Sequence, residues 1–86
     1  MQLSTAIRQR IINIAKSKDM SFIDLCKEIN LSYSTLMSFM NGKSRTIRID
    51  TLLLICDGFK IDLIDFFKDP MFEDVVDEPE NEIIKK

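Results

Sequence analysis

The side chains that most often carry enzyme chemistry are scarce in this sequence. It contains no histidine, and its two cysteines, Cys26 and Cys56, form no CxxC pair. Zinc sites and cysteine nucleophiles need thiols grouped with histidine or with further thiols. The sequence also lacks an obvious pair of catalytic carboxylates and a glycine-rich phosphate-binding loop. We therefore expect a non-enzymatic protein without a metal or cofactor, whose cysteines are core residues or, alternatively, redox sensors.

A second group of side chains, most of them polar, lies at helical spacing. If Leu36 and Phe39 face a core, the helical period turns five residues of the segment 33–41 outward. These are Tyr33, Ser34, Met37, Ser38 and Asn41. A polar loop with three cations follows over 43–48. Both segments could bind a polar or anionic partner, and the alternative for each is an ordinary solvated surface.

Five helices are expected to position these side chains. Apolar residues recur at spacings of three and four from Leu3 to Ala15, with Arg8 and Arg10 off that stripe, which predicts an amphipathic helix. The most apolar pattern follows Ile49 and predicts the buried central helix. A final short helix, capped by Asp62, carries Ile64, Phe66 and Phe67. The first four helices are predicted over 2–17, 22–29, 33–41 and 50–59.

The ends of these helices carry recognisable signals. Ser21 with Asp24 resembles a capping box, and Ser32 can cap the helix over 33–41. Asn30 tolerates the left-handed conformation that stops a helix and redirects the chain. Gly42 stands where another left-handed residue is needed. We therefore expect a sharp turn between the second and third helices.

Length and composition indicate a single all-α domain. A chain of 86 residues supports one core, and 45% hydrophobic residues with only two Gly and two Pro favour helices. No apolar run approaches the roughly 18 residues of a membrane span. We expect a soluble, unprocessed cytoplasmic protein.

The net charge of −2 and the isoelectric point near 5.0 hide an uneven distribution. Residues 1–69 carry ten Lys/Arg against eight Asp/Glu, whereas residues 70–86 carry two against six. The acidity thus belongs to the tail, and a basic face on the domain remains possible. The tail is interpreted as disordered, or alternatively as a segment that docks on a second subunit through Met71, Phe72, Val75 and Val76.

Several motifs together resemble the Cro and phage-repressor family of helix-turn-helix regulators, also called the XRE family. Leu25-Cys26 stands where the family has Leu-Ala, and Gly42-Lys43 closes the recognition helix. The run Leu31-Ser32-x-Ser34-Thr35-Leu36 matches Val-Ser-x-x-Thr-Ile, and Asp50-Thr51-Leu52-Leu53 continues in register. The likeness spans about residues 3–68. It implies a compact five-helix bundle of the lambda-repressor-like type over 1–69, with the helix-turn-helix motif at 21–41.

The sequence departs from the family pattern at five positions. Phe22 replaces a common Gln that touches a phosphate, and Asn30 replaces the Gly of the turn. Met40 stands for Glu or Gln, Ile47 for Pro, and Lys60 for a helix-ending Gly or Asn. None of these changes removes the fold.

The resemblance implies a transcriptional regulator, most commonly a repressor, that reads the major groove of double-stranded DNA with the helix over 33–41. Because one such module covers only about 600 to 1,000 Å² of protein surface, we expect a homodimer on a palindromic operator, paired through the fifth helix and the tail. Because the reading face has no Arg, Lys or Gln, DNA shape should contribute much of the specificity. The base-reading candidates are Tyr33, Ser34, Ser38 and Asn41. The phosphate-binding candidates are Ser32, Thr35, Lys43, Ser44, Arg45 and Arg48.

A protein-binding module on the same fold, such as an antitoxin or an adaptor, is the alternative function. No small-molecule ligand is evident from the sequence. The resemblance points to a bacterial or phage-encoded protein associated with the nucleoid.

Overall fold

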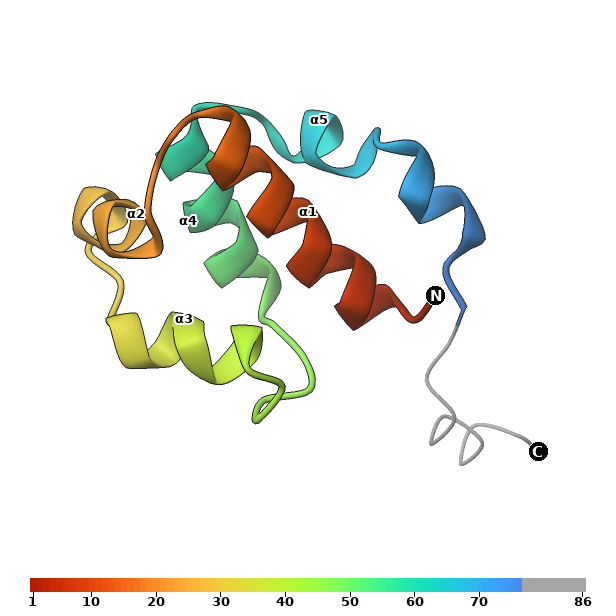
Figure 1. The fold of residues 1–86 in the computed structure, drawn as a ribbon, viewed down its shortest axis with the longest axis horizontal. Helices are drawn as coiled ribbons and strands as arrows, with labels where there is room; N and C mark the ends of the chain where they lie inside the picture. The colour runs from red at the N-terminus through yellow and green to blue at the C-terminus, as the bar shows by residue number, and fades with distance from the viewer. Residues whose placement is uncertain (77–86) are drawn as a thin grey trace.

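The computed structural model describes residues 1–76, which form five α-helices and one short 3-10 helix (Figure 1). In chain order these are α1 (Leu3–Ser17), α2 (Phe22–Ile29), α3 (Tyr33–Met40), α4 (Ile49–Phe59), α5 (Leu63–Phe67) and the 3-10 helix η1 (Pro70–Asp74). The all-α, five-helix fold predicted from the sequence is confirmed. Within residues 1–76, no helix has the length and apolar character needed to cross a membrane.

The core forms where the apolar stripes of the five α-helices meet. α4 supplies four of the eight largest fully buried side chains, in keeping with its strongly apolar sequence. A glycine brings α4 close to α2, because a Cβ atom added at Gly58 would lie 2.6 Å from both Leu25 Cδ1 and Ile29 Cγ2. The largest fully buried side chains are Ile11, Leu25, Leu36, Leu52, Ile55, Cys56, Phe59 and Phe66.

Left-handed residues end the helices at the turns that shape the fold. Asn30 follows α2 with φ 57°, and Gly42 follows α3 with φ 86°. Lys60 ends α4 with φ 64°, although its Cβ atom makes that conformation costly. The capping box of Ser21 and Asp24 is present at the start of α2. These local signals were readable in the sequence because each cap involves residues only a few positions apart.

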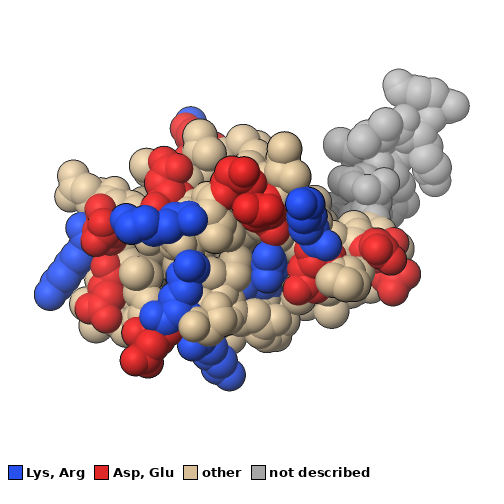
Figure 2. Space-filling view, turned by 90° about the horizontal axis from the view of Figure 1, so that it is seen from above, with Lys and Arg blue, Asp and Glu red and all other residues tan. Residues whose placement is uncertain are grey.

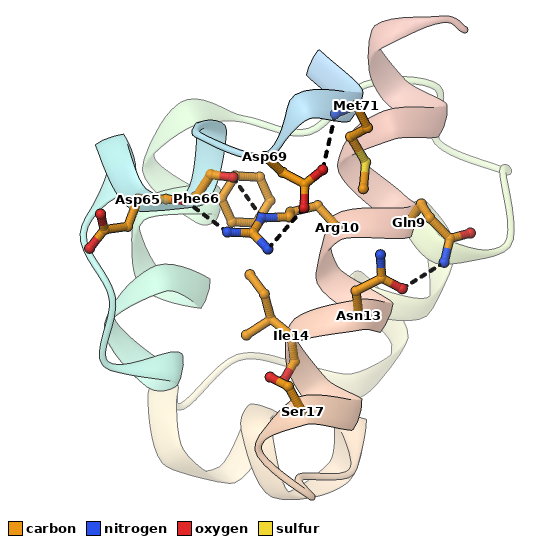
Figure 3. A network of polar contacts seen from close by, with 9 residues as sticks. All are labelled: Gln9, Arg10, Asn13, Ile14, Ser17, Asp65, Phe66, Asp69 and Met71. Carbon is orange, nitrogen blue, oxygen red and sulfur yellow. Dashed lines mark hydrogen bonds and ion pairs between the residues drawn. The ribbon is translucent and has the colours of Figure 1, made fainter. Parts of the chain in front are cut away.

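Arg10 joins α1 to α5 through contacts that the sequence did not reveal (Figure 3). Its Nε–H donates to the Phe66 carbonyl at 2.7 Å, and its Nη2 donates to the Asp65 carbonyl at 2.8 Å. The guanidinium also lies 3.6 Å from the Asp69 carboxylate. The arginine thus holds the last helices of the domain against the middle of α1.

The chain continues to pack on the domain beyond the expected boundary at Pro70. The ring of Phe72 in η1 lies 6.0 Å from that of Phe66 and 4.9 Å from that of Phe67, measured between centroids. The backbone N–H of Val76 donates to the carbonyl of Met1 at 3.0 Å. Residues 70–76, which we expected in the tail, therefore lie on the folded domain. The rest of that tail, 77–86, lies outside the described residues.

Candidate nucleic-acid interface

α2 and α3 form two helices joined by a tight turn. Only three residues separate them, and the Leu31 N–H donates to the Cys26 carbonyl at 3.0 Å to close the turn around Asn30. In Figure 1, α2 is seen almost end-on while α3 runs across the lower edge of the molecule, so the chain changes direction sharply. Ser32 caps the start of α3, where its Oγ accepts the Thr35 N–H at 3.4 Å. This arrangement leaves one side of α3 without a neighbouring helix.

The four base-reading candidates lie on that open side of α3. Leu36 and Phe39 are turned into the core, with 1% and 3% of their surface exposed. Tyr33 is 48% exposed. Ser34 and Asn41 are exposed as well, whereas Ser38 is half-buried. The helical period thus predicted the direction of these side chains, and it did not predict the partial shielding of Ser38.

The phosphate candidates fall into two groups at opposite ends of α3. Ser32 and Thr35 are exposed at its start, where the Ser32 and Ser34 hydroxyls lie 2.9 Å apart. Lys43 and Arg45 are exposed after its end, on either side of Ser44. The Ser44 N–H donates to the Ser38 carbonyl at 2.9 Å. The loop carrying the two cations is therefore tied back to α3.

Arg48 has an anionic partner close to it in the chain. Its Nε and Nη2 donate to the two carboxylate oxygens of Asp50 at 3.0 and 2.9 Å. The hydrogen bond from Arg48 lowers the pKa of Asp50, and the same bond raises the pKa of Arg48. A DNA phosphate would have to compete with this carboxylate.

Acidic residues are distributed unevenly along the chain, and one long segment has none. No acidic residue occurs between Glu28 and Asp50, a stretch that contains α3 and three cations. Figure 2 views the molecule from above, with α3 on the far side, and there Lys/Arg and Asp/Glu side chains are intermixed. The segment that contains α3 therefore carries no carboxylate of its own that would repel a polyanion.

Arg8 is a residue near this surface that the sequence did not single out. Its Nε–H donates to the Phe39 carbonyl at 2.6 Å, and its Nη2 donates to the Ser44 carbonyl at 3.2 Å. The guanidinium also lies 4.6 Å from the centre of the Phe39 ring. The only signal in the sequence was a cation off the apolar stripe of α1, and that pattern does not name a partner on another helix.

Both cysteines are buried in the core. Cys56 is fully buried, and Cys26 is 5% exposed. Burial raises the pKa of both thiols, and that of Cys56 reaches about 11 because Asp57 and Asp62 also disfavour a thiolate. Within residues 1–76, no three His, Cys, Asp or Glu side chains group as metal ligands would. The environment of the thiols favours packing over reactivity.

The turn between α2 and α3, together with the open face of α3, defines a helix-turn-helix protein. A family model of the Cro/C1-type helix-turn-helix DNA-binding domain matches residues 10–70. The chain belongs to this family and is a DNA-binding regulator of the XRE type, as the resemblance of its motifs predicted.

Comparison with solved structures supports the same fold. The crystal structure of the prophage Lp1 protein 11 is similar, with a TM-score of 0.76 and 20% sequence identity. The match covers 87% of this chain and 100% of that one. At this identity the likeness shows the fold alone. A search of curated proteins found no significant match.

Proposed function

We propose that the protein is a sequence-specific transcriptional repressor that places the open face of α3 in the major groove of its operator. The observation that carries this proposal is the acid-free segment from residue 29 to 49, with α3 exposed at its centre. A helix-turn-helix protein binds with its second helix in the major groove, where all four base pairs can be distinguished. A carboxylate on this surface would repel the phosphates, and the segment has none.

Base recognition falls to Tyr33, Ser34, Ser38 and Asn41. Hydroxyl groups can donate to or accept from base edges, and Asn41 can make a bidentate pair with adenine. Exposed Tyr33 can contact a thymine methyl group or reach a phosphate. Since no Arg or Gln is present to read guanine or adenine on this face, the sequence-dependent shape of the DNA supplies part of the specificity.

Affinity comes mainly from Lys43 and Arg45, because cations that neutralise phosphates release condensed counterions. Ser32 and Thr35 add neutral hydrogen-bond donors, whereas the Ser44 hydroxyl must leave the Thr46 carbonyl before it can donate to a phosphate. Arg48 contributes less, since it must leave the Asp50 carboxylate to reach a phosphate. The positive end of the α3 dipole lies at Ser32 and also favours an anion there.

Two copies act together on a palindromic operator. One such module buries only about 600 to 1,000 Å² against DNA, which is little for tight specific binding. α5 supports pairing, because its Ile64 is 71% exposed and lies beside the half-buried Leu63 and Phe67 in a shallow apolar hollow. We propose that this surface, defined by Leu63, Ile64 and Phe67, joins the two subunits.

The proposal is tested by selecting bound sequences from a random duplex pool with the full-length chain, at a low and at a higher salt concentration. Enrichment of a palindrome is expected at both. Repeating the selection with Tyr33→Ala and with Ser38→Ala should change the preference at particular positions of the palindrome. As a matched control, Thr5→Ala on the exposed surface of α1 should leave the preference unchanged.

Two results would contradict this assignment. Absence of any enrichment at low salt would remove the repressor function and favour a protein-binding module on the same fold. An unchanged preference in both the Tyr33→Ala and Ser38→Ala selections would show that α3 does not read the bases.

A further inference from the structure

One side chain of α1 reaches the C-terminal end of α3 and the loop that follows it. Arg8 donates to the carbonyl of Phe39, in the last turn of α3, and to the carbonyl of Ser44 in the loop. Its guanidinium also lies over the Phe39 ring, where a cation is attracted by the aromatic face. Three separate contacts of one partly buried side chain therefore converge on the same short region.

The carbonyls at the end of α3 explain why this region accepts a cation. The last four carbonyls of a helix have no partner within it, and α3 has no basic side chain in its own last turn. The N–H groups of Asn41, Gly42 and Ser44 reach the carbonyls of Met37, Phe39 and Ser38. Arg8 then gives Phe39 a second, charged donor at the negative end of the helix dipole.

The loop held in this way carries the two exposed cations of the interface. Lys43 and Arg45 are the immediate neighbours of Ser44, whose N–H is bound to α3 and whose carbonyl is bound to Arg8. Both backbone groups of Ser44 are thus fixed relative to α1 and α3. The directions in which the two cations leave the backbone are set by that anchorage.

We propose that Arg8 is a positioning residue for DNA binding, which holds the loop 41–45 so that Lys43 and Arg45 are already in place for the phosphates beside the reading face of α3. This inference rests on the proposed function. A loop that is ordered before binding loses less conformational entropy when the complex forms. Arg8 therefore acts through the loop, without itself contacting the DNA.

The chain contains a matched control for this idea. Arg10 also lies on α1, donates to two backbone carbonyls, and has an aromatic ring below its guanidinium at 5.8 Å. Its partners lie in α5 and at Asp69 just beyond that helix (Figure 3), and α5 lies at the opposite edge of the molecule from α3 in Figure 1. A substitution at Arg10 therefore reports the loss of a similar clamp that does not touch the loop.

The test compares Arg8→Lys with Arg10→Lys in the full-length chain. Lysine keeps the charge, but its donors sit on one nitrogen atom and cannot reproduce the planar fork by which Nε and Nη2 of Arg8 reach two separate carbonyls. Both variants are measured well below their unfolding temperatures, on the duplex that the wild-type protein selects. We expect Arg8→Lys to raise Kd about tenfold, because the variant must pay the conformational entropy of ordering about one loop residue on binding. Arg10→Lys should leave Kd within about twofold of the wild-type value.

A second measurement examines the loop without DNA. Hydrogen exchange of the Ser44 amide in the free protein should become faster in Arg8→Lys and stay unchanged in Arg10→Lys. Arg8→Gln, which retains a donor and lacks the charge, serves as a second variant. It should also raise Kd and speed the exchange.

Several outcomes overturn the inference. Equal weakening by the two lysine variants would show a general loss of stability. Wild-type affinity in Arg8→Lys with a loss only in Arg8→Gln would show that Arg8 acts as a charge. Unchanged exchange at Ser44 would show that the loop does not depend on Arg8. If the wild-type protein selects no duplex, the proposed function itself fails, and that result is separate because it needs no variant.

Discussion

The four arginines of this chain carry the same charge and have different roles, which their surroundings determine. Arg8 and Arg10 donate to backbone carbonyls that lie 31 and 56 positions away in the sequence. Arg48 pairs with a carboxylate two positions away. Arg45 lies exposed in the loop after α3. Only the pairing of Arg48 is local enough to be predicted from sequence, and the roles of Arg8 and Arg10 required the fold.

The Cys56 thiol gives a prediction about pH. Because burial raises its pKa to about 11, the folded state favours the protonated thiol. The unfolded thiol titrates near 8.5. The contribution of the thiol to the free energy of unfolding is therefore complete below that value and is lost as the pH rises toward 11.

The measurement is the urea midpoint at several values between pH 8 and 11, for the wild-type protein and for Cys56→Ala. The variant has a lower midpoint at pH 8, because it leaves a small cavity, and its midpoint should fall less steeply with pH. Other groups titrate equally in both proteins. If the urea midpoints of the two proteins fell in parallel with pH, the raised pKa of Cys56 would be contradicted.

At the scale of single elements, the helix ends were predicted well and the contacts between helices were not. Ser21 with Asp24, Asn30 and Gly42 sit where their local chemistry predicted. The role of Gly58 was not predicted, because a glycine within a helical pattern does not indicate which helix packs against it. In the structure it lets α4 approach Leu25 and Ile29 of α2, a packing relation between residues far apart in the chain.

Lys60 allows a test of the cost of a left-handed residue. Lys60→Gly should raise the free energy of unfolding by about 0.5 to 1 kcal/mol, because glycine has no Cβ penalty at φ 64°. The variant also loses an exposed ion pair with Glu28 at 3.7 Å, which contributes little. Chemical denaturation measures the change.

Lys60→Ala is the matched control for that substitution. It removes the same ion pair and keeps a Cβ atom at the left-handed position, so it should give no increase in stability. An equal gain from alanine and glycine would show that the backbone conformation is not the cause.

At the scale of the whole molecule, the composition of the sequence predicted the fold class. It did not predict that the folded part of the chain continues beyond Pro70. The acidic character that begins near Pro70 suggested a tail from that point. Phe72 nevertheless packs on Phe66 and Phe67, because one aromatic side chain can find a partner even in a polar segment. Hydrophobic periodicity cannot predict a single contact of this kind.

Pairing through α5 is a property of the assembly and has its own test. Ile64→Glu should convert a dimer to a monomer in sedimentation and lower the affinity for a palindromic duplex, because it buries a charge at the proposed interface. Leu54→Glu, at an exposed apolar position of α4, is the control and should leave the association state unchanged. A wild-type protein that is monomeric both alone and on the duplex would contradict the proposed dimer.

The central claim, that the open side of α3 binds DNA phosphates, is tested most directly by the salt dependence of affinity. The double variant Lys43→Gln with Arg45→Gln is compared with Lys60→Gln plus Lys68→Gln, which removes the same charge from the side of α4 and α5. The slope of log K against log salt should flatten by about 1.8 in the first variant, or 0.9 for each lost phosphate contact, and stay near wild type in the second. Equal slopes for the two double variants would show that the α3 side is not the one that binds DNA.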